Sequence, residues 1–526
     1  MLVEVPAMLK LAFSLGVSSR FGALLSQFTF RSRASLFVLP DEILSEVVAE
    51  LDLHDVLTVR RVCKILGEIS HLRMVWLQVF LKRLDAYPRP FFLPKSLKHC
   101  TARGLEDAIR SWQAKGPGTI RTQSSAASVL WGGPSQVKES SIHLLPGGRW
   151  MIVGCRDGSV WYLDLEKLGN SGEGTPALLT PACPGLLEGF SLAIDYSSPE
   201  ANPTLLDEFH LASFNLATIT SYQDKPNSFY KGVVKVWHIK VTFDDHDGLN
   251  AVGLETSECL YSCRDDNAVH TDSPACALYG IQVAYLSYLH PNPASTPSTG
   301  AVPDVTIRKW SSPPYSGSIS FHEPHYYDYM ALMPNQRLLL VSRHVDTFRL
   351  ISVRYDVPEN EKPVLEISVV IAPQDMPTPA PTFDIEAIPQ PVCFGKDIHL
   401  TFTNNYGELY TFRVPSEGCM IAPALDRFGC TLIPPAQPAG TRCRAFGYSR
   451  FVEFNTPEDV HVGHYTRDGE SIQSRVAYSK VDIPTETFGE RLADLIRRPF
   501  FDQYSNTAVW VNQPLSHICI VRMCSL

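Results

Sequence analysis

From about residue 120 to residue 526 the apolar residues of this chain alternate with polar ones in short runs, and Gly, Pro, Asn and Asp separate the runs. A period of two is typical of half-buried strands, and the separating residues are typical of turns. Because proline cannot donate to a sheet ladder, the clusters among the 40 prolines, at 291–303, 373–391 and 434–438, indicate loops and exclude a long helical solenoid. This part of the chain is therefore predicted to be all-β.

One unit shows the repeat most clearly. Short strands are expected at 141–145, 150–153 and 158–164, joined by Pro-Gly-Gly and Arg-Asp-Gly turns at 146–148 and 156–158. The pattern of the third strand, a turn glycine followed by alternating residues, returns at 232–237 and 407–412. The length from residue 120 to the end allows six or seven such units with inserted loops. The pattern thus predicts an irregular β-propeller-like domain.

A first helix is expected after Leu39. Pro40 fits the first helical position, where its missing N–H costs nothing, and Asp41 and Glu42 complement the helix N-terminus. The apolar residues that follow predict one buried face, formed by Ile43, Leu44, Val47, Val48 and Leu51.

Further helical spacing follows the expected N-cap Asp52. Apolar residues continue at intervals of three and four to Ile69, with the basic residues between them on the solvent side, namely Arg60, Arg61 and Lys64. A third apolar stripe is formed by Trp76, Val79, Phe80 and Leu84, and Leu105, Ile109 and Trp112 predict another helix within 101–113.

The order and spacing of these elements resemble the F-box family. The residues that carry the resemblance are Leu39-Pro-Asp-Glu-Ile-Leu44, Leu51, Asp55-Val-Leu57, Val62-Cys-Lys64 and Val75-Trp76. Two departures are Val75, where Leu is more usual, and Gly67, which lies inside an expected helix. The β region resembles, more loosely, the WD-repeat-like propellers that follow F-boxes in many proteins, and the strands expected at 501–505, 508–511 and 518–521 look like a closing set.

The resemblance implies an α+β multidomain protein with a leader at 1–36, an F-box at 37–84, a helical linker at 85–118 and a β-propeller-like target-binding domain at 119–526. It implies docking on a Skp-type adaptor, and through it on a cullin, while the propeller binds a protein target. Trp76 would close the packing of the F-box. The implied adaptor contacts are Leu39, Pro40, Ile43, Leu44, Leu51, Val56, Val62 and Cys63.

Three alternatives remain open at this point. The helical residues could form the core of an ordinary small bundle, since generic helical periodicity gives a similar pattern. The chain could be a non-catalytic propeller scaffold that is not linked to ubiquitin. It could also be an enzyme that uses the central opening of the propeller, although Asp157, Asp164 and Asp304 are more simply explained as turn and strand-end residues.

No motif for catalysis, a cofactor or a metal stands out. The chain has neither a phosphate-binding Gly-rich loop followed by Lys-Ser/Thr nor a Gly-x-Ser-x-Gly elbow. His322 and His325 are three residues apart with Pro324 between them, whereas a HExxH helix needs four. A second set of possible zinc ligands also lacks the closely paired spacing of a structural zinc site. These residues are Cys259, Cys263, His270 and Cys276. We therefore expect no catalytic residue, cofactor or metal.

Composition and charge limit the partners and the cellular compartment expected for the protein. The formal net charge of −9 argues against nucleic acid as a partner. The sequence contains no run of 18 apolar residues, so no membrane-spanning helix is predicted. The 13 cysteines are scattered singly, which is typical of free thiols in a reducing compartment. Residues 1–36 are basic and faintly resemble a mitochondrial presequence, but we expect a disordered leader. The expected location is intracellular, in the cytoplasm, the nucleus or both.

Overall fold

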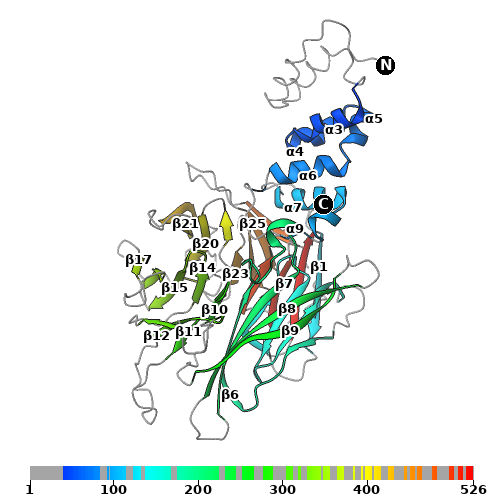
Figure 1. Ribbon diagram of the computed structural model, residues 1–526. Coiled ribbons are helices and arrows are strands. Elements are labelled where there is room, and N and C mark those ends of the chain that lie inside the picture. Colours follow the sequence, from blue (N-terminus) through cyan, green and yellow to red (C-terminus); the bar gives the residue numbers. More distant parts are fainter. Residues whose placement is uncertain are drawn as a thin grey trace. The chain divides into compact units, whose positions relative to one another are not determined.

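A computed structural model describes the greater part of the chain (Figure 1). The described residues are 39–82, 84, 92–93, 95–113, 123–131, 137–167, 175–223, 231–244, 251–265, 276–287, 304–311, 318–321, 329–344, 347–355, 364–371, 383–384, 392–394, 397–404, 408–415, 424–431, 443–446, 450–456, 459–464, 477–481, 497–502, 507–512 and 517–524. The chain divides into a helical unit, Met1–Tyr87 with Leu93–Ala114, and a sheet unit, Pro88–Phe92 with Lys115–Leu526.

The helical unit contains short helices that pack around one apolar core (Figure 1). In chain order they are α3 (Asp41–Ala49), α4 (Leu53–Val59), α5 (Lys64–Ile69), α6 (Arg73–Lys82), the 3-10 turn η3 (Leu97–His99) and α7 (Ala102–Gln113). Helix α7 packs on α6, so the helix expected at 101–113 is part of this unit. None of the helices in the described ranges is long and apolar enough to cross a membrane.

Three details of the expected helices were wrong. Pro40 is the N-cap of α3 and does not lie within the helix, because its ψ of 150° is not helical. The helix that begins after the N-cap Asp52 ends at Val59, and a turn at 60–63 separates it from α5. Ile43 points away from the face that buries Leu44 and Val48. Two short helices allow the apolar residues on both sides of the turn to reach the same core.

The sheet unit contains seven antiparallel sheets in the described part of the chain. The first two are β2 (Val137–Leu144), β3 (Trp150–Cys155), β4 (Val160–Asp164) and β5 (Ala177–Thr180), and β6 (Leu186–Asp195), β7 (Ser213–Gln223), β8 (Lys231–Phe243) and β9 (Ala251–Arg264). The next two are β10 (Cys276–Tyr279), β11 (Gln282–Ser287), β12 (Asp304–Lys309) and β13 (Ser318–Phe321), and β14 (Tyr329–Met333), β15 (Arg337–His344), β16 (Thr347–Arg354) and β17 (Val364–Ile371).

The fifth sheet has an additional short strand. It comprises β18 (Phe383–Asp384), β19 (Val392–Phe394), β20 (Asp397–Asn404), β21 (Glu408–Pro415) and β22 (Ala424–Thr431). The sixth comprises β23 (Cys443–Phe446), β24 (Arg450–Thr456), β25 (Asp459–His464) and β26 (Ala477–Val481). The last comprises β27 (Arg497–Asp502), β28 (Thr507–Asn512), β29 (His517–Cys524) and β1 (Gln123–Leu130). A short helix, α9 (Leu205–Glu208), lies between β6 and β7.

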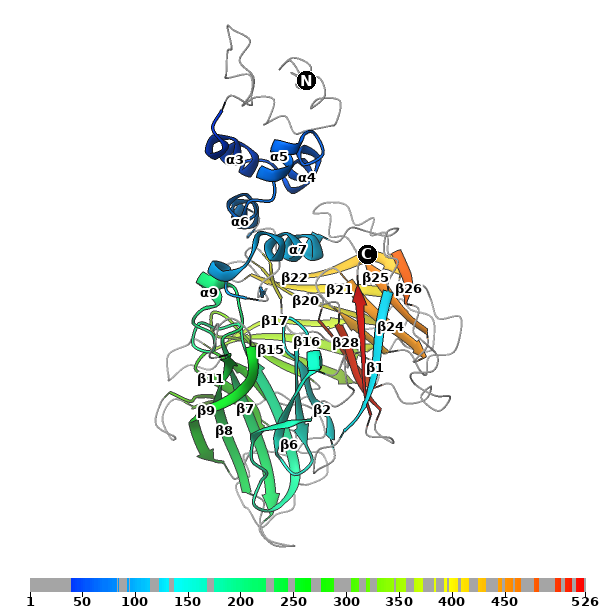
Figure 2. The ribbon, with the colours of Figure 1, turned by 90° about the vertical axis from the view of Figure 1, so that its right-hand side faces the viewer.

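The last sheet joins the two ends of the β region. Strand β1 pairs antiparallel with β29, with Gln123 opposite Cys524 and Leu130 opposite His517. Figure 2 shows the cyan strand β1 beside the red C-terminal strands. The strands expected at 508–511 and 518–521 are therefore confirmed, the one expected at 501–505 is described as Arg497–Asp502, and the fourth strand of the set comes from the start of the β region.

Neighbouring sheets bury their faces against each other. Strand β3 shows this well, because Met151 and Val153 face the last sheet while Trp150 and Ile152 face the second. Further apolar clusters join the second sheet to the third and the third to the fourth. Stacked sheets with both faces buried confirm the propeller-like, all-β architecture, and seven sheets lie within the expected six or seven units.

The turn glycines predicted in the first unit are confirmed. Gly147, Gly148 and Gly158 adopt positive φ angles of 92°, 66° and 80°, which residues with a side chain rarely adopt. Strand β8 contains the pattern at 232–237 and β21 contains 408–412 of the other pattern, and each is third in the order of hydrogen-bonded strands of its sheet. The alternation thus marks the same position in different sheets, whereas Gly232 lies inside β8 and not in a turn, and Gly407 lies outside the described residues.

Candidate functional site

The start of α3 presents two adjacent residues in opposite environments. Ile43 is 41% exposed, whereas the next residue, Leu44, is 1% exposed. Successive positions on a helix lie about 100° apart, so only one of the two can face the core. Pro40 is exposed and Leu39 is half-buried just before the helix. The first turn of α3 therefore offers an apolar corner to a partner.

The eight expected contact residues fall into two groups. Five are accessible, namely Leu39, Pro40, Ile43, Val62 and Cys63. Three belong to the core of the unit, namely Leu44, Leu51 and Val56, each at most 5% exposed. The accessible group could touch a partner directly, and the core group holds the backbone that presents it.

Exposed apolar side chains are concentrated in the helical unit. Five of the seven large hydrophobic residues that are most exposed in the described chain lie there, namely Ile43, Ile65, Leu72, Met74 and Leu81. Met74 and Leu81 are seven residues apart on α6 and so share one face, opposite to the face that buries Val75, Trp76, Val79 and Phe80. Exposed apolar surface on a small helical unit indicates a protein-docking site.

Our reading of the sequence missed the outer face of α6. The signal was present, because the run from Met74 to Leu81 is apolar at almost every position and a helix of that kind cannot bury all its faces in a small unit. Only the buried stripe was recognised, since it alone fitted the periodicity.

Trp76 closes the core of the unit. Its side chain is fully buried, and its indole Nε1 donates a 2.8 Å hydrogen bond to the carbonyl oxygen of Ser70. The guanidinium of Arg60 lies 5.6 Å from the centre of the indole ring, within the range of a cation–π contact. The side chain thus fixes α6 to the end of α5 by both packing and polar contacts.

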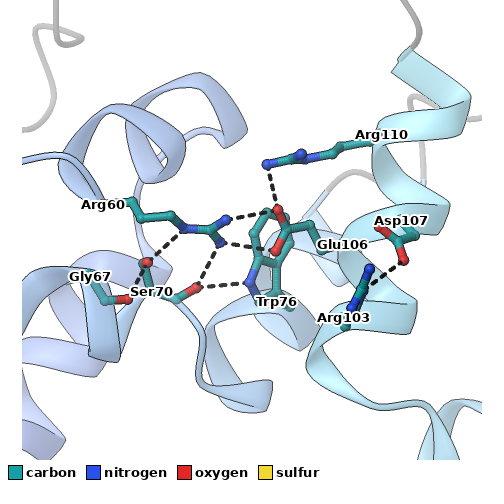
Figure 3. Close-up of polar contacts among 8 residues, drawn as sticks. All are labelled: Arg60, Gly67, Ser70, Trp76, Arg103, Glu106, Asp107 and Arg110. Atoms are coloured by element: carbon teal, nitrogen blue, oxygen red, sulfur yellow. Dashed lines mark hydrogen bonds and ion pairs between the residues drawn. The ribbon is translucent and has the colours of Figure 1, made fainter. Parts of the chain in front are cut away.

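Arg60 is not on the solvent side, and that expectation was wrong. Its Nη1 and Nη2 donate to Oε1 and Oε2 of Glu106, each at 2.9 Å, and its Nε donates to Ser70 Oγ at 3.0 Å (Figure 3). The Arg60 and Glu106 side chains are only 20% and 9% exposed. Arg110 also contacts Glu106 at 2.5 Å. This bidentate pair joins the turn after α4 to α7.

Two cations of α6 satisfy backbone carbonyls elsewhere in the unit. Lys82 Nζ donates to the Ala49 carbonyl at 2.8 Å and pairs with Glu50 at 2.7 Å, at the C-terminus of α3. Arg73 donates to the carbonyls of Cys100 and Leu97 at 2.9 and 2.7 Å. Positive charge at helix C-termini is favourable. These contacts fix both ends of α6 within the unit.

The described residues offer little that could do chemistry. No group of three or more His, Cys, Asp or Glu in this part of the chain could hold a metal ion, and His270, His322 and His325 lie outside the described residues. Cys259, Cys263 and Cys276 are free thiols. Burial raises the pKa of the Cys100 thiol and that of Cys259, which favours the less reactive protonated form.

The three carboxylates considered for a propeller enzyme lie in turns or at the ends of strands. Asp157 Oδ1 accepts a hydrogen bond from the Ser159 backbone N–H at 2.9 Å within a turn. Asp164 ends β4 and pairs with Arg149 at 3.1 Å. Asp304 is the first residue of β12. These positions are those of turn and strand-end residues, as expected.

Comparison with known proteins bears on both units. Residues 36–78 match the F-box domain family, and no curated protein matches the sequence. Among solved structures, the chain is similar to the β-propeller domain of Cps50 (Swd1) of Myceliophteria thermophila, with 11% identity, a TM-score of 0.37 and coverage of 78% of this chain and 100% of that one. It is also similar to the WD40 repeats of RRP9, with 10% identity, a TM-score of 0.35 and coverage of 78% and 99%.

Proposed function

Since the chain carries an F-box domain at residues 36–78 ahead of a propeller-like all-β region, we propose that it is the substrate-recognition subunit of a Skp-cullin-F-box ubiquitin ligase. In this proposal the F-box binds a Skp-type adaptor and the sheet unit binds a protein target. The chain itself supplies no catalytic residue. It acts inside the cell, in the cytoplasm, the nucleus or both.

The observation that carries the proposal is the exposed apolar surface of the helical unit. Leu39, Pro40 and Ile43 at the first turn of α3, with Val62 and Cys63 in the turn after α4, supply the accessible residues of the F-box pattern. A unit of this size exposes more apolar surface than it can bury alone, so the helices of an adaptor would be a natural cover.

The mechanism would be proximity. A target held by the sheet unit near a charged ubiquitin carrier experiences a high effective concentration of that carrier. Affinity for the target can then be modest, and the chemistry of ubiquitin transfer belongs to other subunits. This division explains why the proposal needs no nucleophile or metal in this chain.

The test is co-expression of the full chain with a Skp-type adaptor, followed by size-exclusion chromatography with mass determination. We expect a one-to-one complex. The double variant Leu39→Ala with Pro40→Ala should abolish it and leave the sheet unit folded, because these residues lie outside the core. Leu178→Ala is the matched control, since Leu178 is 51% exposed on β5 of the sheet unit.

Two results would contradict the proposal. A well-folded chain that remains alone in the presence of the adaptor would favour a scaffold that is not linked to ubiquitin. A complex that survives the double variant would show that the adaptor docks elsewhere on the chain.

A further inference from the structure

We propose that Glu106, which lies outside the matched F-box residues, is a positioning residue for the adaptor-docking surface and acts through Arg60. The inference rests on the proposed function and extends it to α7. It assigns this helix a part in presenting the docking surface.

The element that Glu106 would position is the turn at 60–63. Arg60 directly follows α4, and the turn carries Val62 and Cys63, both of which are accessible. Its backbone is held locally by Arg61 N–H to the Thr58 carbonyl and by Val62 N–H to the Val59 carbonyl, each at 3.0 Å. Both bonds lead back to α4, and a third, from the Gly67 N–H to the Cys63 carbonyl at 2.9 Å, leads forward to α5, so none of the three ties the turn to α7.

The side chain of Arg60 supplies that restraint. On one side it donates to Ser70, through Nε to Oγ at 3.0 Å and through Nη2 to the carbonyl at 3.4 Å. On the other side it makes two 2.9 Å bonds to the Glu106 carboxylate (Figure 3). One guanidinium therefore connects the turn to the end of α5 and to α7.

Close packing makes the turn sensitive to this restraint. A Cβ atom added to Gly67 would lie 3.2 Å from the Arg60 carbonyl oxygen, so the turn passes directly against α5. The Ser70 hydroxyl in turn donates to the Gly67 carbonyl at 2.7 Å. Arg60, Gly67 and Ser70 thus lie in direct contact. A small shift of the turn would therefore disturb the packing of the turn against α5.

Glu106 is well placed to hold Arg60. Its neighbours on α7, Leu105 and Ile109, are completely buried, so the helix is anchored in the core. The carboxylate is 9% exposed and faces two arginines, Arg60 and Arg110. Planar bidentate pairs of this kind are directional, and loss of one partner leaves the other with unmet hydrogen bonds in a partly dry site.

Without the carboxylate the turn would sample more than one arrangement. An adaptor that binds only one of them would then bind more weakly, in proportion to the population of that arrangement. We expect Glu106→Gln to weaken adaptor binding about tenfold, in the range set by the loss of a charge-assisted hydrogen bond.

The experiment measures adaptor affinity by calorimetry and backbone amide hydrogen exchange on the full chain and three variants. Glu106→Gln is expected to lose about tenfold in affinity and to accelerate exchange within 60–63 while exchange in α3 and α6 is unchanged. Arg110→Gln removes the more exposed partner of the same carboxylate and should change affinity less than threefold. Arg103→Gln removes a largely exposed pair with Asp107 on the same helix and should leave affinity and exchange unchanged.

Three outcomes would overturn the inference. Affinity and exchange of Glu106→Gln equal to those of the wild type would show that the pair has no positioning role. Exchange accelerated equally throughout α3–α6 would show general destabilisation instead. An affinity loss in Arg110→Gln as large as that in Glu106→Gln would assign the effect to the contact between Glu106 and Arg110 within α7, and not to Arg60. If the wild type does not bind the adaptor, the proposed function fails, and the exchange at 60–63 still tests the link from Glu106 to the turn.

Discussion

The indole Nε1 of Trp76 donates a hydrogen bond of 2.8 Å to the carbonyl oxygen of Ser70, six residues earlier in the chain. Both residues are fully buried. A tryptophan at this position of the F-box pattern therefore contributes a polar contact as well as volume. This bond fixes the start of α6 against the end of α5.

Replacement of Trp76 by Phe tests that contact. The ring would still fill most of the space, but the Ser70 carbonyl would lose its best donor, and we expect the helical unit to lose about 1–3 kcal/mol of stability. Trp76→Ala, which also opens a cavity, should cost about 3–5 kcal/mol. Urea unfolding followed by far-UV circular dichroism measures both, and equal losses in the two variants would show that the hydrogen bond dominates over packing.

Substitution of the neighbours Ile43 and Leu44 should affect different properties, adaptor affinity for Ile43 and stability for Leu44. Leu44→Ala removes a core side chain and should lower the free energy of unfolding by about 2–5 kcal/mol. Ile43→Ala removes an exposed side chain, so stability should change by less than about 0.5 kcal/mol while adaptor affinity falls. Chemical denaturation and calorimetric titration of both variants separate the effects. A stable Ile43→Ala variant with unchanged affinity would remove Ile43 from the contact set.

Gly67 should resist the substitution that usually stabilises a helix. Alanine is favoured over glycine by about 1 kcal/mol inside a helix, but here its Cβ would lie 3.2 Å from the carbonyl oxygen of Arg60. The Arg60 side chain holds that backbone in place, so we expect Gly67→Ala to be neutral or destabilising. In an Arg60→Ala background the turn can move, and the same substitution should then stabilise. A double-mutant cycle measured by urea unfolding gives the coupling free energy between Gly67→Ala and Arg60→Ala. Additive effects of the two substitutions would contradict this prediction.

The sheet unit should lose stability on mild acidification through His143. Burial lowers the pKa of this histidine on β2 to about 4, although a hydrogen bond with the Leu192 backbone acts in the opposite direction. The unfolded chain takes up the proton near pH 6.5 and the folded chain only near pH 4. Stability is therefore complete above pH 6.5 and falls as the pH drops from 6.5 to 4, by up to about 3 kcal/mol.

Unfolding by urea at pH 7.5, 6 and 5 measures this loss, with tryptophan fluorescence as the signal. His143→Gln is the control, because glutamine does not titrate in this range and the variant should show a smaller loss on acidification. An identical pH dependence in the two proteins would show that another group is responsible.

The local pattern of the sequence was enough to find the elements that repeat or that follow helical spacing. The turn glycines at 147, 148 and 158 and the alternation after them located real strands, since both depend only on neighbouring residues. The buried faces of α3 and α6 were recognised for the same reason. The residues of the docking surface stay a prediction, because a pattern of apolar positions does not separate the exposed Ile43 from the buried Leu44.

Contacts between distant segments were not visible in the sequence. Arg60 was expected in solvent because it lies between apolar residues of a helical pattern. Nothing in the neighbouring sequence indicates its contact with Glu106, which lies 46 residues later. The turn at 60–63 was missed because the spacing of the apolar residues continues through it. The pairing of β1 with β29 was also absent from the expectations, since strand partners are chosen by the whole fold.

The pairing of Gln123 with Cys524 also sets the order in which the sheet unit can be completed. Translation delivers β1 before the other described strands of the sheet unit, and its partner β29 is the last of those strands to be made. Until then both the free edge of β1 and the apolar face that Val509, Ile518 and Ile520 later cover are accessible. The nascent chain therefore carries an unpaired edge while the rest of the sheet unit is made, a state in which assistance from chaperones has the greatest effect on yield.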